Sequence, residues 1–462
     1  MRQFLALGCL LFSFPFGMMA QEDSTKVPVN IQFLRAQENY RYLAEAKEKN
    51  IWESIKYIRL NRTKKPYPYL SLGADFRSEF QIRNNENWNP AEDDVGVLFQ
   101  RIMVHSDWQL SEQFRFFVQL KSGYTVGRDG PKFFLDNDDL DVHQAFIQYR
   151  ITNWRFEFGR RELWYGSRRL ISIREGTNIR QSFDGGRIIY EHNQHRFDAL
   201  FFAYNPQRTG VFDNPVNFDQ LLWGIYYTGQ QLFDQVSNFD FYYLGSYQAN
   251  PSFERGMEED RRHSIGVRHF GGLGKFNFNT EAILQLGTFD EQNILAWTFS
   301  TDVGFQWIQQ EKFQSSIGLK LDVITGDNAP NDNKLRTFNP LYPRGGYFGL
   351  LAIIGPSNLI DFHPSIGFGF GERWSFSVDW DFFWRESLAD GIYFPSGRLQ
   401  VPGNGSNSRY IGSQGGLEVV YEVSPYLELE TSWFYFFAGD FIQSVTPGAN
   451  VSQFGLSMKF RI

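Results

Sequence analysis

Alternation of apolar and polar side chains at every second residue is the feature that most constrains this chain of 462 residues. The alternation begins near Tyr69 and persists to the C-terminus. Because successive side chains of a β-strand point to opposite faces, this period predicts strands with one apolar face and one wet face. The clearest examples are residues 70–80, 114–121, 276–286, 317–323, 374–385 and 454–462.

The length and the ends of these strands favour a membrane barrel over a soluble β-sandwich. Sandwich strands usually span about 5 to 6 residues, whereas the predicted strands run to about ten and carry aromatic residues at their ends. Aromatic residues make up 18 % of the chain, although hydrophobic residues reach only 42 %. No apolar run of about 18 residues follows residue 20, so a chain that enters a membrane must cross it with strands.

The length of the chain sets the expected size of the barrel. Roughly 395 residues remain from residue 67 onward, and at roughly 22 residues per strand and connection they form about 18 strands. The last segment, residues 454–462, ends the chain in a strand and resembles the terminal strand of bacterial outer-membrane proteins, with Ile462 in place of the usual Phe. The predicted fold class is therefore all-β, a transmembrane antiparallel β-barrel over residues 67–462.

The N-terminal part of the chain follows a different pattern. Residues 1–20 combine Arg2 with an apolar stretch, which predicts a signal peptide cleaved before Gln21. Cleavage would remove Cys9, the only cysteine, and leave no disulfide. A lipoprotein signal at Cys9 is a less favoured alternative, because most of the apolar stretch would follow it. Residues 21–66 predict a short, partly helical periplasmic segment, either packed at a barrel mouth or binding a partner protein as a helix.

Charge and motif content argue against several functions. The chain has 45 Lys and Arg residues against 52 Asp and Glu residues, a net charge of −7, so no nucleic-acid partner is expected. No phosphate-binding loop, dinucleotide fingerprint or nucleophile elbow is present, and no cofactor is expected. His363 and Ser365 could be a nucleophile pair, but Pro364 between them predicts a structural loop. The protein is therefore not expected to be an enzyme.

Two acidic segments, residues 136–141 and 325–334, carry oxygen ligands of the kind that calcium prefers. Neither matches the twelve-residue calcium loop with its closing glutamate, and acidic loops are common on protein surfaces. No metal site is therefore assigned. Both segments, together with residues 401–410, are expected to be loops between strands.

Four longer motifs follow one another in the barrel region. They are FGRRELWYGSRRLISIREGTNIRQSFDGGRI (Phe158–Ile188), GDNAPNDNKLRTFNPLYPRGGYFG (Gly326–Gly349), NLIDFHPS (Asn358–Ser365) and FFWRESLADGIY (Phe382–Tyr393). Together these motifs resemble the alginate-export family of outer-membrane β-barrels, and the resemblance extends over residues 69–462.

The resemblance implies a monomeric channel of 18 strands in the outer membrane of a Gram-negative bacterium. Such a channel passively conducts alginate or a similar anionic polysaccharide from the periplasm to the exterior. Its partners would be that polysaccharide, outer-membrane lipid and periplasmic polysaccharide-export proteins. A loop or residues 22–66 are expected to gate the channel, because an open barrel of this width would leak. Two alternatives remain: a porin for small anionic or neutral solutes, and an outer-membrane hydrolase using His363 or Ser365.

A conduit for a polymer with one carboxylate per sugar needs cations along its path, and arginine suits bidentate contact with carboxylates. The candidate path residues are Arg160, Arg161, Arg168, Arg169, Arg174, Arg180, Asp184, Arg187, Arg344 and Arg385. The alternative is that these arginines brace loops and strand ends by pairing with nearby acids such as Glu162 and Glu175. The polar phase of the strands does not decide between the two, because Arg77 and Lys320 are offset there by acids such as Asp75 and Asp322.

Overall fold

The computed structural model describes residues 31–462 with the exception of residues 62, 64, 92–95, 129 and 233. The predicted signal peptide, residues 1–20, lies outside the described residues. Within the described ranges, no helix is both long enough and apolar enough to cross a bilayer.

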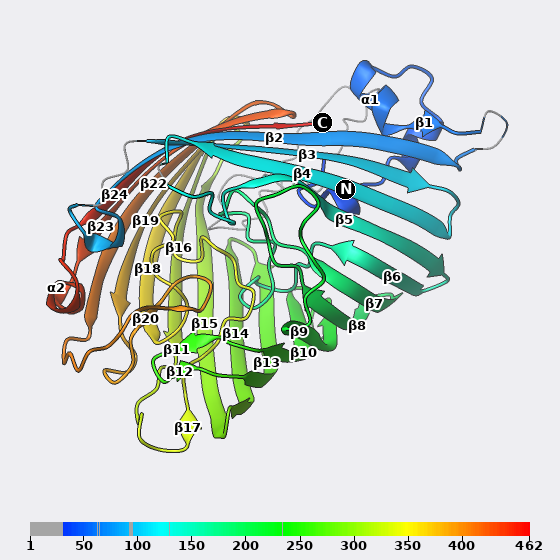
Figure 1. Ribbon diagram of the computed structural model, residues 1–462. Helices are drawn as coiled ribbons and strands as arrows, with labels where there is room; N and C mark the ends of the chain where they lie inside the picture. The colour runs from blue at the N-terminus through cyan, green and yellow to red at the C-terminus, as the bar shows by residue number, and fades with distance from the viewer. Residues whose placement is uncertain (1–30, 62, 64, 92–95, 129, 233) are drawn as a thin grey trace.

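Eighteen antiparallel strands form a closed barrel, which confirms the predicted fold class (Figure 1). Each strand pairs with its neighbours in the chain, and β2 pairs with β24 to close the ring. The barrel strands are β2 (Tyr69–Asn84), β3 (Val97–Gln109), β4 (Phe114–Val126), β5 (Asp138–Ile151), β6 (Trp154–Arg161), β7 (Phe183–His192), β8 (His195–Tyr204), β9 (Gln220–Gly229), β10 (Ser237–Gln248), β13 (Asp260–Leu273), β14 (Phe276–Phe289), β15 (Gln292–Gln309), β16 (Phe313–Ile324), β18 (Leu359–Phe370), β19 (Trp374–Trp384), β22 (Tyr410–Ser424), β23 (Leu427–Ala438) and β24 (Val451–Arg461).

Shorter elements lie before the barrel and between its strands. They are η1 (Arg35–Gln37), η2 (Arg41–Ala44), α1 (Ile51–Lys56), β1 (Ile58–Arg59), η3 (Glu86–Trp88), β11 (Ser252–Phe253), β12 (Gly256–Met257), β17 (Lys334–Leu335), β20 (Ile392–Tyr393), β21 (Leu399–Val401) and α2 (Asp440–Val445). The N-terminal segment is thus partly helical, as predicted, but its helical pieces are single turns or little more. Contacts with the barrel override the helix propensity of the sequence there.

Alternation places apolar side chains on the outside of the barrel and polar side chains inside. On β14, for example, Leu284 and Leu286 are 38 % and 39 % exposed, whereas Glu281 and Gln285, on the opposite face of the strand, are buried. In a membrane the exposed apolar positions contact lipid, and the inward polar groups must find partners inside the barrel. The lumen is therefore lined by polar and charged side chains that bond to one another.

The two mouths of the barrel differ in the length of their connections. One mouth has short turns such as residues 193–194 and 274–275, and both the N-terminal segment and the C-terminus lie there. The opposite mouth carries the long segments 162–182, 325–358 and 385–409. In outer-membrane barrels the short turns are periplasmic and the long loops extracellular, which assigns an orientation to this chain.

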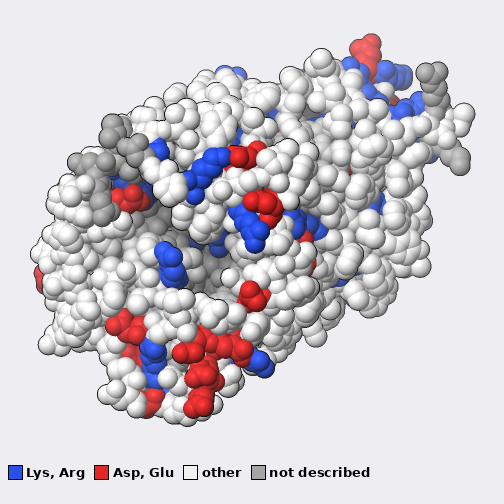
Figure 2. Space-filling view, viewed as in Figure 1, with Lys and Arg blue, Asp and Glu red and all other residues white. Residues whose placement is uncertain are grey.

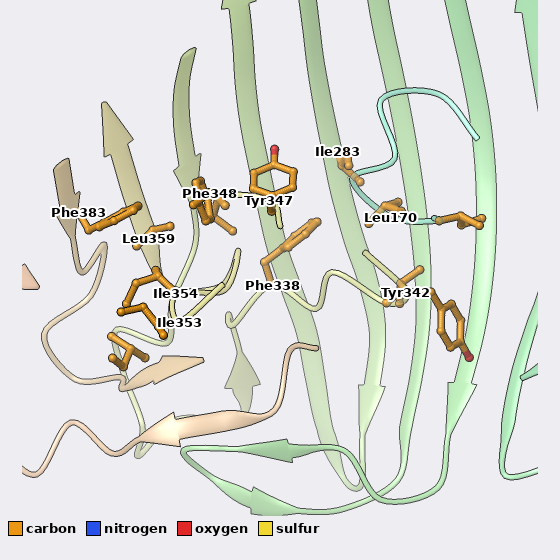
Figure 3. Packing of buried hydrophobic residues seen from close by; sticks show 14 of the residues in the cluster. Leu170, Ile283, Phe338, Tyr342, Tyr347, Phe348, Ile353, Ile354, Leu359 and Phe383 are labelled. Carbon is orange, nitrogen blue, oxygen red and sulfur yellow. The ribbon is translucent and has the colours of Figure 1, made fainter. Parts of the chain in front are cut away.

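Two of the long segments fold back into the lumen and pair with each other there. The Ser172 backbone N–H donates to the Tyr342 carbonyl at 2.9 Å, and the Tyr342 N–H donates to the Leu170 carbonyl at 2.9 Å. Their buried apolar side chains, among them Leu170, Tyr342 and Phe348, pack against inward residues of the wall such as Ile283 (Figure 3). The lumen is consequently filled in part by a hydrophobic core built on loops.

The N-terminal segment is seated in the short-turn mouth, with α1 and β1 beside the start of β2 (Figure 1). Arg35 is the centre of this contact: it pairs with Glu38 at 3.2 Å and Asp75 at 3.6 Å and donates to the carbonyl of Ile462. Glu38 in turn lies 3.6 Å from Lys56 Nζ. Burial raises the pKa of Glu38, but Arg35 and its other partners outweigh it and hold this pKa at about 2.

Two expectations about loops were wrong. Residues 138–141 of the first acidic segment belong to β5, because the strand extends further toward the long-loop mouth than the Asp-rich sequence predicts. His363, Pro364 and Ser365 lie within β18 and not in a loop. Proline lacks the N–H for one ladder bond, and the pairing of β18 with β19 is interrupted at His363 and Pro364, while pairing with β16 continues.

We predict that Leu284→Arg destabilises the folded barrel by about 2–4 kcal/mol, because it places a charge on the lipid face near the middle of β14. Urea unfolding of the protein in phospholipid vesicles measures the effect. Leu284→Ala is the control, since it removes side-chain volume without adding a charge. Equal stability of the Arg and Ala variants would contradict the lipid-facing assignment.

Candidate functional site

A polar cavity of about 130 Å³ lies in the lumen between the inserted loops and the wall. Its lining residues are Trp164, Gly166, Ser167, Arg168, Arg169, Arg268, Asn279, Asp302, Lys320, Arg344 and Tyr347. Five of these side chains are basic and one, Asp302, is acidic. We call this the cationic cavity. The first motif supplies its Trp164–Arg169 part and the second supplies Arg344 and Tyr347.

Arg168 and Arg344 carry the uncompensated charge of the cationic cavity. No carboxylate of the described chain pairs with either guanidinium: Arg168 stacks 4.6 Å from the centre of the Trp164 ring, and Arg344 donates to the Gly346 carbonyl at 3.2 and 3.1 Å. Burial and the nearby Arg268 lower the pKa of Arg168 to about 10. Burial and Arg168 lower the pKa of Arg344 well below its usual value. An anion in this cavity would relieve both effects.

The other cations of the cavity are paired with acids of the wall. Arg169 contacts Asp322 and lies 3.2 Å from Glu281, and Arg268 lies 3.0 Å from Asp240. Lys320 is 3.6 Å from Asp322. It also stands opposite Asp302, the acidic residue of the cavity, in the register of β15 and β16. The cavity is therefore basic on balance, but most of its cations already have a partner.

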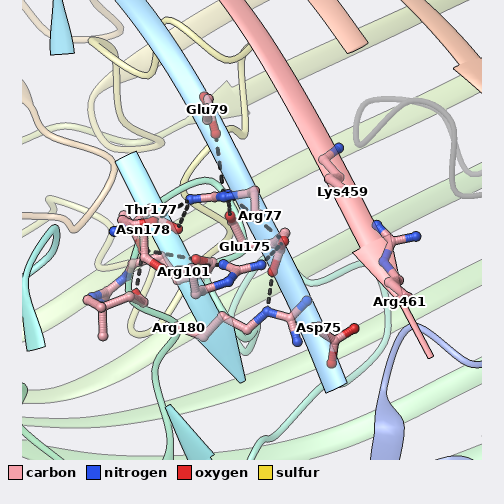
Figure 4. Close-up of polar contacts among 12 residues, drawn as sticks. Asp75, Arg77, Glu79, Arg101, Glu175, Thr177, Asn178, Arg180, Lys459 and Arg461 are labelled. Carbon is pink, nitrogen blue, oxygen red and sulfur yellow. Dashed lines mark hydrogen bonds and ion pairs between the residues drawn. The ribbon is translucent and has the colours of Figure 1, made fainter. Parts of the chain in front are cut away.

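A second group of arginines surrounds Glu175, which is buried in the segment between β6 and β7 (Figure 4). Arg101 lies 2.6 Å from Glu175, Arg180 contacts it closely, and Arg77 donates to its backbone carbonyl at 3.2 Å. Burial raises the pKa of Glu175, but Arg101, Arg180 and Arg77 outweigh it and hold the pKa well below the usual range. This group ties the inserted segment to β2 and β3.

Four further predicted path residues form ion pairs on β6 and β7. Arg160 binds Asp184 with Nε–Oδ1 at 2.7 Å, and Arg187 binds Glu157 with Nε–Oε2 at 2.6 Å. Arg161 contacts the same Glu157. For these residues the bracing interpretation agrees with the observed contacts.

The remaining predicted residues are also held within the protein. Arg385 donates to the backbone carbonyls of residues 388, 390, 406 and 408 and so organises the segment after β19. Arg174 donates to the Tyr204 hydroxyl at 3.4 Å. Arg180 pairs with Glu162 at 3.2 Å in addition to the contact described above.

The N-terminal segment reaches the first inserted loop from the opposite mouth. Phe33 lies under the Arg180 guanidinium, 4.8 Å from its carbon, and packs edge-to-face with Trp164 at 5.4 Å. Because Trp164 lines the cationic cavity, the segment that closes the short-turn mouth touches the wall of the cavity directly.

Sequence reasoning missed Arg268 and Asp302 and counted Lys320 only as an inward charge. Arg268 shares the inward phase of β13 with Arg262, while Val267 between such positions is exposed, so the alternation alone could have identified it. Its place in the cavity could not be predicted, because that depends on strand register and on the inserted loops.

The acidic segments considered for calcium have cationic partners instead. In the first segment, Asp136 pairs with Arg128 at 2.6 Å and Asp138 with Lys121 at 3.1 Å. In the second, Asp332 pairs with Arg336 at 2.6 Å. Figure 2 shows a hollow on this face of the molecule, with Lys and Arg interspersed with some Asp and Glu above it, and mainly Asp and Glu below it.

Comparison with solved structures supports the fold. The chain resembles Pseudomonas aeruginosa OccK2 (OpdF) in complex with glucuronate, with a TM-score of 0.56, 11 % identity and coverage of 85 % of this chain and 98 % of that one. A BenF-like porin from Pseudomonas fluorescens Pf-5 gives a TM-score of 0.56, 11 % identity and coverage of 85 % and 98 %. P. aeruginosa OpdK with vanillate gives a TM-score of 0.54 and 10 % identity, with coverage of 85 % of this chain and 98 % of that one.

Comparison with sequences identifies the family. Among curated proteins, none matched this sequence significantly. The family model described as alginate export matches residues 68–455, a range that begins just before β2 and ends within β24. It therefore contains nearly the whole barrel, both inserted loops and the cationic cavity. The chain belongs to the alginate-export family of channels in the outer membrane of Gram-negative bacteria.

Proposed function

We propose that this protein passively conducts an anionic polysaccharide, alginate or a close relative of it, from the periplasm to the exterior. The observation that carries the proposal is the presence of Arg168 and Arg344 in a lumen cavity without a carboxylate partner in the described chain. Guanidinium groups of this kind donate two parallel hydrogen bonds to a uronate carboxylate in a bidentate contact. The C–H faces of the sugar rings would contact the aromatic rings of Trp164 and Tyr347, which line the same cavity.

The paired cations explain how a polymer can be bound without being retained. Arg169, Arg268 and Lys320 are already neutralised by wall carboxylates, so each adds only a weak attraction for a passing anion. Two unpaired guanidinium groups among several neutralised ones give a shallow site. A chain of identical sugars can then exchange one carboxylate for the next as it moves.

The N-terminal segment is the proposed gate. Its buried ion pairs at Arg35 and Glu38 and the Phe33 contact with Trp164 support a closed resting state at the periplasmic mouth. Passage of a polymer would require this segment to leave the mouth. In the cell the displacing partner would be a periplasmic polysaccharide-export protein or the polymer itself, and the barrel would act as a monomer.

A porin for small anionic solutes is the second candidate, and the small volume of the cationic cavity favours it. One of the similar structures, OccK2 (OpdF), is a complex with glucuronate, and a single uronic acid presents the same carboxylate as a polyuronate. A catalytic role is not proposed, because both ring nitrogens of His363 face carboxylates, Asp379 and Asp381, in the wall.

We predict that the double variant Arg168→Gln, Arg344→Gln loses affinity for uronate oligomers. Each hydrogen bond to a charged group contributes about 1.5–3 kcal/mol, so the oligomer concentration for half-block of the channel should rise at least about tenfold. The measurement is single-channel recording in a planar bilayer with oligomers added, together with the reversal potential in a salt gradient. Arg261→Gln, at a largely exposed arginine of β13, is the control.

The same recordings separate the two candidate functions. Block that strengthens with oligomer length supports the polysaccharide conduit, whereas equal block by the monosaccharide and the oligomer supports the porin. Unchanged block and unchanged reversal potential in the double variant would refute both, since Arg168 and Arg344 would then lie off the path.

We predict that deletion of residues 22–57 increases small-ion conductance severalfold, because it removes the segment seated in the short-turn mouth. Conductance of single channels in symmetrical salt is the readout. Ile51→Ser is the control, since Ile51 is 71 % exposed and its replacement leaves the seated contacts intact. Conductance equal to that of the full chain would show that the segment does not obstruct the lumen.

A further inference from the structure

Three side chains of the barrel wall gather at one point on β18 and β19. Asp361 and His363 are two residues apart on β18 and so share its lumen face, and Asp381 is on the neighbouring strand. One potential ligand atom of each lies within 4.8 Å of the others. Within the described ranges this is the one group of three or more His, Cys, Asp or Glu side chains that meets this condition.

His363 lies where the backbone pairing of β18 with β19 is interrupted, next to Pro364. The pairing of β18 with β19 stops after Phe362 and resumes at Ser365, which faces Asp379. In this gap His363 Nδ1 lies 2.7 Å from Asp381 Oδ1, and its Nε2 lies 3.8 Å from Asp379 Oδ2. The imidazole thus stands between two carboxylates of the adjacent strand.

Asp361 is the member of the group whose buried carboxylate has no hydrogen-bond partner in the described chain. It is 1 % exposed, and neither of its carboxylate oxygens has a hydrogen-bond partner in the described chain. It also stands directly opposite Asp322 in the register of β16 and β18. Like charges opposite each other on one face are unfavourable, and a buried carboxylate without partners is more so. Both conditions call for a cation at this place.

The basic side chains nearby, Arg169 and Lys320, contact Asp322 and not Asp361. Asp322 accepts from the Tyr347 hydroxyl at 3.1 Å and is paired with Arg169. Lys320, opposite His363 in register, is 3.6 Å from Asp322 and 3.9 Å from the centre of the Tyr347 ring. Asp361, Asp379 and Asp381 therefore share one imidazole, and even a protonated His363 would leave a net charge of −2 in a buried group.

We propose that Asp361, His363 and Asp381 bind a divalent transition-metal ion of the zinc class. His363 would bind through Nδ1 and donate its Nε2 proton to Asp379, the arrangement by which an outer carboxylate orients a metal-bound histidine. A neutral imidazole with two carboxylates balances a divalent charge. One nitrogen and two carboxylate ligands suit zinc with water in the remaining position, whereas calcium takes six to eight oxygen ligands.

The bound ion would join β18 to β19 where their backbone pairing is interrupted. It would also act on the second inserted loop, because Gln414 Nε2 donates to the Phe348 carbonyl at 2.7 Å and to Asp381 Oδ2 at 3.3 Å. The site would therefore stabilise the wall beneath the loop that carries Arg344. This inference does not depend on which solute the channel conducts.

Calorimetric titration of the folded full chain in detergent with zinc chloride, after treatment with a chelator, tests the proposal. We expect one ion per chain and a rise in the thermal unfolding midpoint with zinc. Loss of an outer partner typically weakens metal affinity about 10–100-fold, so removal of a direct ligand in Asp361→Asn should weaken it at least about 100-fold. The matched control is Asp260→Asn, another buried inward carboxylate, which pairs with Arg262.

Heat-dependent mobility in gels verifies that each variant is folded before titration. Zinc binding in the wild-type chain and the Asp260 variant, together with its loss in the Asp361 variant, supports the site. Absence of zinc binding in the folded wild-type chain, or equal binding in the Asp361 variant, would overturn it. Preference for calcium over zinc would overturn the assignment to a transition metal. A thermal unfolding midpoint of the wild-type chain that does not change with zinc would also contradict the proposal.

Discussion

Hydrogen bonding of the backbone inside lipid is the constraint on which the rest of this structure depends. A strand that crosses a bilayer has no water to satisfy its N–H and C=O groups, so the sheet has to close on itself. Pairing of β2 with β24 achieves this closure and leaves no exposed edge within the barrel. Closure also sends every second side chain into a confined lumen, where charged groups must find partners among themselves.

The pairing of charges in the lumen distinguishes arginines that stabilise the structure from arginines that are available to a ligand. Arg160, Arg180 and Arg187 each meet a carboxylate of the wall or of the inserted segment, and they brace these parts of the structure. Arg168, from the same motif, and Arg344, from the second motif, meet none in the described chain. The reverse imbalance occurs on β18 and β19, where carboxylates outnumber cations. Unpaired charge of either sign thus marks the places at which a ligand is expected.

Access to these places is restricted from both ends of the barrel. The inserted loops pair with each other at Ile171 and Tyr342, far apart in the sequence, and fill the long-loop side of the lumen. From the other mouth the N-terminal segment places Phe33 against Trp164, so the two obstructions meet at the cationic cavity. The lumen of this outer-membrane channel is thus obstructed from both mouths, and of the two obstructions the N-terminal segment is the proposed gate.

Much of the fold could be predicted from the sequence, because alternation is a local property that does not depend on where a strand lies. Alternation was sufficient for the barrel and for the outward phase of residues such as Leu284, and the chain length added the strand number. The candidate site could be predicted only as a set of arginines. Strand register and the fold of the loops decided that Arg168 lies in a cavity beside Lys320 while Arg160 is paired, and that Asp361 and His363 meet Asp381. These contacts join residues up to some 150 positions apart, and only the closed barrel brings them within reach of each other.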